Sequence, residues 1–143
     1  MPHAWLGLGA NIGDPAAQLA EAVRRLDALP DVRVAKRSPM LATRAWGRTE
    51  QPDFQNMVVE VETALGPLPL LEACLAVETD MGRIRRERWG PRVIDIDVIA
   101  YERQVMATDR LTLPHPLAHE RDFVLAPLRI IAPEVAEWIE ART

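Results

Sequence analysis

Two acidic residues interrupt an apolar run in the segment RVIDIDVIA, which ends at Ala100. Asp95 and Asp97 are two residues apart, and side chains alternate along a β-strand, so both carboxylates are expected on one face. Neighbouring carboxylates repel each other, and a divalent cation removes that repulsion. Oxygen ligands favour Mg²⁺, which commonly takes one or two carboxylates together with water and substrate phosphates. A solvated strand face without a metal is the alternative for this pair taken alone.

Five arginines lie just before the two aspartates: Arg83, Arg85, Arg86, Arg88 and Arg92. Like charges at this density repel unless an anion or an acid is present, and the planar guanidinium suits bidentate binding of phosphate or carboxylate. A surface loop with ion pairs to Glu87 is the alternative. Carboxylates and arginines together favour a site for a metal-bound nucleotide, in which charge develops on transferring phosphoryl oxygens.

Two further segments carry residues suited to ligand binding. In QPDFQN, Phe54 and Asn56 fall on one face of a strand start and could stack on and hydrogen-bond a flat heterocycle. The alternative fits the sequence equally well: Phe54 is an ordinary half-buried strand residue and Asn56 an asparagine in a turn. In GLGANIGD the glycine spacing differs from that of dinucleotide-binding loops, so Gly7 and Gly9 are interpreted as allowing a backbone or a ligand to approach the strand.

The segment LPHPLAHERDF contains two histidines four residues apart, His115 and His119. Zinc binding would place both on one helix face, and Pro116 argues against a helix at the first of them. Contact of His115 or Arg121 with a phosphate is the favoured interpretation.

The composition indicates a globular protein. The 143 residues fit a single domain, residues 1–143, with one core. The net charge of −4 and the pI of about 5.4 argue against nucleic acid as a partner, and no apolar run reaches the roughly 20 residues of a membrane span. The lone Cys74 is expected in the core, and without a secretory signal the expected location is the cytoplasm.

The elements that must position these residues follow the order β-α-β-β-α-β, with turns and short helices after them. Helix starts and stops are set by Asp14, Pro30 and Gly82. A short edge element at 104–106 is expected to pair with the aspartate strand. The expected strands cover residues 3–9, 32–38, 54–65 and 93–100, the helices residues 13–30 and 68–82, and an unpatterned loop residues 39–52. This order predicts an α+β fold of the ferredoxin-like type, with helices on an antiparallel sheet.

The sequence resembles the 6-hydroxymethyl-7,8-dihydropterin pyrophosphokinase family from about Trp5 to Pro133. The resemblance rests on the stretches LGLGANIGD, QPDFQN, LLEACLAVETDMGR, ERWGPRVIDIDVIA and LTLPHPLAHERDF. It implies a ferredoxin-like α/β/α sandwich with C-terminal helices, acting as a monomer. The implied reaction of folate biosynthesis moves the β,γ-diphosphate of ATP to the pterin's hydroxymethyl oxygen and releases AMP.

The resemblance also implies a role for individual residues. Two Mg²⁺ ions are expected on Asp95 and Asp97, and the catalytic set adds Arg83 and Arg92. The ATP-binding positions are Glu78, Arg85, Trp89, Val98, Arg110, Leu111, Thr112, His115 and Arg121. The pterin-binding positions are Thr43, Ala45, Trp46, Phe54, Asn56 and Phe123. Pro116 and Leu75 depart from the residues common in the family.

Two other classes of function are compatible with the fold. A ferredoxin-like module could bind a nucleotide through the arginines without releasing AMP. An RNA-binding sandwich would use exposed aromatic residues on its sheet, and the acidic pI and the absence of the matching aromatic motif disfavour it.

Overall fold

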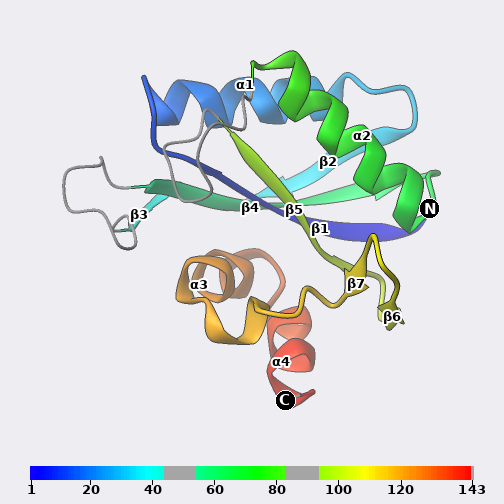
Figure 1. The fold of residues 1–143 in the computed structure, drawn as a ribbon. Helices are drawn as coiled ribbons and strands as arrows, with labels where there is room; N and C mark the ends of the chain where they lie inside the picture. The colour runs from blue at the N-terminus through cyan, green and yellow to red at the C-terminus, as the bar shows by residue number, and fades with distance from the viewer. Residues whose placement is uncertain (44–53, 83–93, 143) are drawn as a thin grey trace.

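The computed structural model in Figure 1 describes residues 1–43, 54–82 and 94–142. Its main sheet is antiparallel, with the strand order β2-β4-β1-β5, and β3 pairs with β4 next to β2. The strands of this sheet are β1 (His3–Ala10), β2 (Val32–Arg37), β3 (Leu41–Thr43), β4 (Phe54–Thr63) and β5 (Asp95–Tyr101). The predicted α+β, ferredoxin-like order of elements is confirmed.

Helices cover both faces of the sheet and make a three-layer sandwich. Figure 1 shows α1 (Pro15–Asp27) and α2 (Pro67–Asp80) on one face, and α3 (Asp122–Ile131) and α4 (Pro133–Ala141) on the other. A short 3₁₀ helix, η1 (Ala118–Glu120), leads into α3.

Local sequence signals set the ends of the first two helices. The Asp14 side chain accepts a hydrogen bond from the Ala17 N–H at 3.2 Å and caps α1, with Pro15 in the first turn. After α2, Gly82 takes a φ of 88°, a left-handed conformation that glycine adopts without a steric penalty. The start of α1 at Asp14 and the stop of α2 at Gly82 were predicted correctly, whereas α1 ends at Asp27, before the predicted stop at Pro30.

The sheet has one hydrophobic core on each face. In β4, Met57 and Val59 pack under α1 and α2, whereas Val58 packs with Trp5 and Ile99 under α3 and α4. Glu60 lies on the same face as Val58 and is only 7% exposed, so this face buries a carboxylate as well as apolar side chains. The Glu60 carboxylate accepts hydrogen bonds from Trp5 Nε1 at 3.0 Å and pairs with His3 Nδ1 at 2.8 Å.

Two short elements differ from the prediction. The segment 39–52 was expected to lack structure, but its residues Leu41–Thr43 form β3. The edge element near residues 104–106 was expected to pair with the aspartate strand. Instead β6 (Met106–Ala107) pairs with β7 (Thr112–Leu113) in a separate two-stranded sheet. Strands of two or three residues carry too few side chains for an alternation pattern to specify a partner.

Within residues 1–43, 54–82 and 94–142, no helix has the length and apolar character needed to cross a membrane.

Candidate active site

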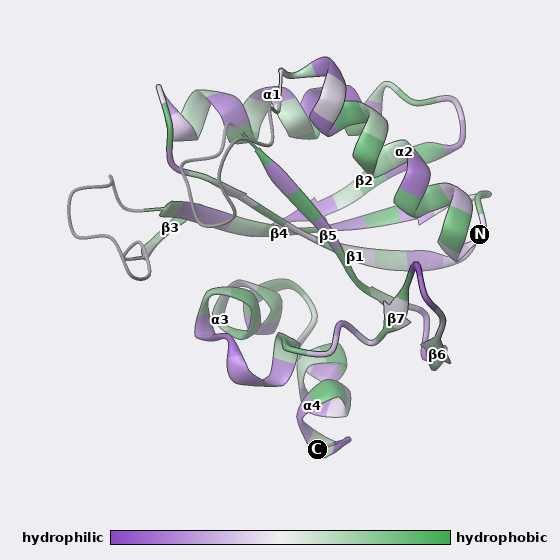
Figure 2. Cartoon of the chain, in the orientation of Figure 1, coloured by the Kyte–Doolittle hydropathy of each residue, from purple (hydrophilic) through white to green (hydrophobic). Residues whose placement is uncertain are grey.

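The two aspartates of β5 lie on the sheet face that α3 and α4 cover only in part. Ile96 and Val98 are buried in the core beneath α1 and α2, whereas Asp95 is half-buried and Asp97 is exposed. Because strand residues alternate between faces, both aspartates are on the opposite face from that core. Figure 2 shows this as alternating hydrophilic and hydrophobic colours along the first half of β5.

Strand register places Asn56 and Asp95 in one row across the sheet. Gly9 of β1 lies opposite Asn56 of β4 on one side and opposite Asp95 of β5 on the other. Since neighbouring strands are about 4.8 Å apart, the Cα atoms of Asn56 and Asp95 are separated by about 10 Å. Gly7 holds the equivalent place between Val58 and Asp97.

Gly9 has a packing reason to be glycine. A Cβ built on Gly9 would lie 2.7 Å from Asn56 Oδ1, closer than real contacts allow. The Asn56 carboxamide therefore extends over β1, toward the strand that carries Asp95. The sequence interpretation expected a backbone or a ligand to approach this glycine; a close approach is found, but the approaching group is a side chain.

The carboxylates suit a divalent cation that brings other ligands with it. Asp95 and Asp97 provide hard oxygen donors on one face, as Mg²⁺ prefers. No group of three or more His, Cys, Asp or Glu side chains arranged for a metal occurs in the described ranges. A cation at this face would complete its coordination with water and phosphate oxygens, which is the usual pattern for Mg²⁺ with a nucleotide.

His115 lies close to the aspartate face. Its backbone N–H donates to the Ile99 carbonyl of β5 at 2.8 Å, and its Nδ1 accepts from the Leu117 N–H at 3.2 Å. Burial lowers the pKa of His115, and the charge of Arg121 lowers it further, against the opposing effect of Asp97. A neutral imidazole whose Nδ1 accepts this bond carries its proton on Nε2, where it can donate to a ligand.

Phe123 and Phe54 belong to the same side of the sheet as Asn56. Phe123 is the second residue of α3 and packs, partly buried, against the core of that side. The Arg121 guanidinium lies 5.4 Å from the centre of its ring. Phe54 is half-buried at the start of β4, two residues before Asn56. Thr43 pairs with Phe54 across β3 and β4.

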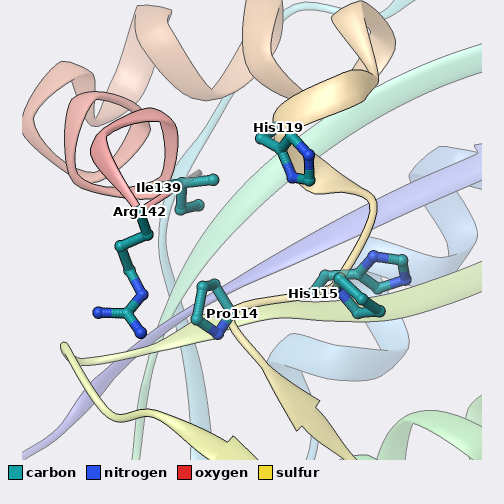
Figure 3. A pocket seen from close by; sticks show the side chains of 6 residues that line it. Pro114, His115, His119, Ile139 and Arg142 are labelled. Atoms are coloured by element: carbon teal, nitrogen blue, oxygen red, sulfur yellow. The ribbon is translucent and has the colours of Figure 1, made fainter.

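A small pocket lies beside His115, as Figure 3 shows. Its lining consists of Pro114, His115, Pro116, His119, Ile139 and Arg142. Both histidines share this space with a guanidinium, and a positive charge disfavours a bound metal cation.

The predicted nucleotide residues divide into two groups by burial. Val98 and Leu111 are 3% and 8% exposed within the core, so any ligand contact there would use the backbone. Thr112 is exposed on β7, and Arg110 is exposed and pairs with Glu72 of α2 at 3.1 Å. These residues lie near the edge of the sheet formed by β5.

Several predicted site residues lie outside the described ranges. They are Ala45, Trp46, Arg83, Arg85, Trp89 and Arg92. Their roles stay predictions from the sequence.

Sequence reasoning missed the contact that Glu78 makes. This residue is 3% exposed, and its Oε2 accepts a hydrogen bond from the Ile96 N–H at 2.6 Å. The charges of Glu78 and Asp97 add to burial, the main cause, in raising the pKa of Cys74 to about 12. An acid four residues after a core cysteine on one helix was the available signal for a buried carboxylate.

Comparison with known proteins decides the family. Residues 5–133 match the family described as 7,8-dihydro-6-hydroxymethylpterin-pyrophosphokinase (HPPK). The chain belongs to this family. A 2-amino-4-hydroxy-6-hydroxymethyldihydropteridine pyrophosphokinase of Methylorubrum extorquens is 53% identical over 135 residues, covering 94% of this chain and 85% of the relative. The Bacillus subtilis enzyme of the same name is 42% identical over 132 residues, covering 92% and 79%.

The fold also matches a solved structure. A crystal structure of an HPPK-DHPS in complex with substrates superimposes with a TM-score of 0.71 at 15% identity, covering 93% of this chain and 40% of the other. The predictions of the HPPK family, of a diphosphotransferase and of a role in folate biosynthesis are confirmed. HPPK enzymes use ATP as the co-substrate.

Proposed function

We propose that this chain transfers the β,γ-diphosphate of ATP to 6-hydroxymethyl-7,8-dihydropterin on the sheet face that carries Asp95 and Asp97. The hydroxymethyl oxygen forms a bond to the β-phosphorus, and the bond from that phosphorus to the α-phosphate's bridging oxygen breaks. AMP leaves with the electron pair of that bond, and the hydroxymethyl proton is lost. The row Asn56–Gly9–Asp95 is the observation that supports the proposal, because in it an amide suited to a heterocycle and a carboxylate suited to a metal ion share one line across the sheet.

Asp95 and Asp97 would hold two Mg²⁺ ions that also bind the triphosphate. Such ions would supply positive charge that offsets the negative charge developing during transfer. The protein's part is to fix two carboxylates on a rigid strand, backed by the buried Ile96 and Val98.

The nucleotide would lie along the β5 edge. His115 would donate from Nε2 to a phosphate oxygen, and Arg121 and Arg110 would add positive charge. Backbone groups of Val98 and Leu111 and the side chain of Thr112 would contact the rest of ATP. Arg83, Arg85, Trp89 and Arg92 complete the set that the sequence predicts for ATP and for the transferring group. The sequence also assigns Glu78 to ATP, but only 3% of this residue is exposed, so it would act on the site without touching the nucleotide.

The pterin would bind at the other end of the row. Asn56 offers one acceptor and two donor hydrogens, which match the polar edge of a pterin. Phe54 and Phe123 would stack on its two faces, since each lies on this side of the sheet and is only half-buried. Thr43, Ala45 and Trp46 are assigned to the same ligand from the sequence.

We also propose that the chain works as a single-domain monomer in the cytoplasm, without nucleic acid or membrane partners. The acidic pI of about 5.4 and the single buried cysteine support this assignment. Light scattering on the purified chain should give the mass of one copy; twice that mass would contradict the monomer.

The reaction can be tested by measuring AMP. Incubation with ATP, Mg²⁺ and the reduced pterin should release AMP and pterin diphosphate in equal amounts, with little AMP when pterin is left out. Asp97→Asn should abolish this release, and Glu137→Gln, which changes an exposed acid on α4, should leave it unchanged. ADP as the product, or full activity of Asp97→Asn, would refute the proposal.

A further inference from the structure

Glu78 is an acid enclosed by the protein. It lies in the last turn of α2, next to the core residue Val77 and one turn after Cys74, and only 3% of it is exposed. Burying an ionised carboxylate is costly unless hydrogen bonds compensate it. A residue of this kind needs a specific partner.

One such partner is the backbone between the two aspartates. Glu78 Oε2 accepts the Ile96 N–H at 2.6 Å, and this N–H belongs to the peptide group that joins Asp95 to Ile96. β5 is an edge strand of the main sheet in the described part of the chain, so β1 is its only neighbouring strand there. A hydrogen bond to an ionised acceptor is about twice as strong as one between neutral groups.

We propose that Glu78 is a positioning residue for the aspartate pair. The Ile96 N–H bond fixes the peptide plane between Asp95 and Asp97, and thereby the direction in which each carboxylate leaves the strand. Glu78 acts from the helix layer on the opposite side of the sheet, through the backbone. This inference rests on the proposed function, in which Asp95 and Asp97 hold the metal ions.

The loss of metal affinity and activity expected from removing Glu78 can be estimated. Mutation of a residue that orients a metal ligand without binding the metal itself typically lowers metal affinity or activity about 10- to 100-fold. Glu78→Ala removes the acceptor and should lower kcat and Mn²⁺ affinity by about this factor, with the KM for pterin nearly unchanged. Glu78→Gln keeps an acceptor of the same shape and should recover most of the loss.

The direct readout is hydrogen exchange of the Ile96 amide in the ligand-free chain. It should exchange at least about tenfold faster in Glu78→Ala than in the wild type, because a closed hydrogen bond is lost. Cys74→Ala is the matched control, since it truncates a buried residue one turn earlier on α2 without touching that N–H. It should lower stability and leave Ile96 exchange and kcat unchanged.

Three outcomes separate the possibilities. Unchanged Ile96 exchange in Glu78→Ala, or a loss of kcat that Cys74→Ala reproduces at equal stability, would overturn the positioning role. If Glu78→Ala does not fold, Glu78→Gln decides: wild-type Ile96 exchange with at least about tenfold weaker Mn²⁺ binding would contradict action through the backbone bond. A wild-type chain that makes no AMP would instead refute the proposed function.

Discussion

Gly9→Ala tests the row that joins the two halves of the site. The new Cβ would lie 2.7 Å from Asn56 Oδ1, and ordinary contact begins at 3.4 Å, so the carboxamide must retreat by about 0.7 Å. Forcing an extra methyl group into a packed site costs about 1–3 kcal/mol of folding free energy. A displacement of about 1 Å in a substrate-positioning group costs about 100-fold in rate.

The expected result is therefore a loss of about 10- to 100-fold in kcat/KM for the pterin, with a much smaller change in the KM for ATP. Steady-state kinetics of AMP release at varied pterin and at varied ATP would measure both, and urea unfolding would measure the stability. Gly66→Ala is the control, because its Cβ would meet nothing closer than Pro69 Cδ at 3.9 Å.

A double-mutant cycle makes the reasoning refutable. In an Asn56→Ala background the displaced carboxamide is absent, so Gly9→Ala should cost little more activity. Equal losses from Gly9→Ala with and without Asn56 would show that the glycine does not act through this side chain. Wild-type kinetics in the single Gly9→Ala variant would remove Asn56 from the pterin site.

Three further predictions concern single residues. The Cys74 thiol, with its pKa raised to about 12, should not react with Ellman's reagent in the native chain and should react fully in denaturant; fast native reaction would contradict its burial. The pKa of His115 is lowered from 6.5 in the folded state, so its stabilising contribution is present above pH 6.5 and lost as the pH falls through the folded value. Urea unfolding at pH 7.5 and 5.5 should show a smaller loss of unfolding free energy on acidification in His115→Gln than in the wild type. An equal loss in the two proteins would contradict this prediction. Arg92→Ala should lower kcat more than it raises KM, because its charge matches one that forms in the transition state, and a change in KM alone would restrict Arg92 to binding.

The order of the main elements could be predicted from the sequence because each long element carries its own signal. The Asp14 cap of α1 and the left-handed Gly82 after α2 are local features, and they were interpreted correctly. The common face of Asp95 and Asp97 also follows from the period of a single strand.

What could not be predicted depends on contacts between distant segments. The pairing of β6 with β7 is set by packing at the sheet edge, since two-residue strands hold too little pattern. Burial of Glu60 depends on its contacts with Trp5 and His3 of β1, which lie 55 and 57 positions away in the sequence. The bond from Ile96 to Glu78 joins residues 18 positions apart and cannot be inferred from either segment.

The central claim is that Asp95 and Asp97 together hold the divalent ions that bind the triphosphate. Electron paramagnetic resonance of Mn²⁺, titrated into the chain with α,β-methylene-ATP, tests it most directly. The wild type should bind two ions per chain in the ternary complex, and Asp97→Asn should bind fewer while its pterin affinity is preserved. Equal Mn²⁺ stoichiometry and affinity in both chains would contradict the claim.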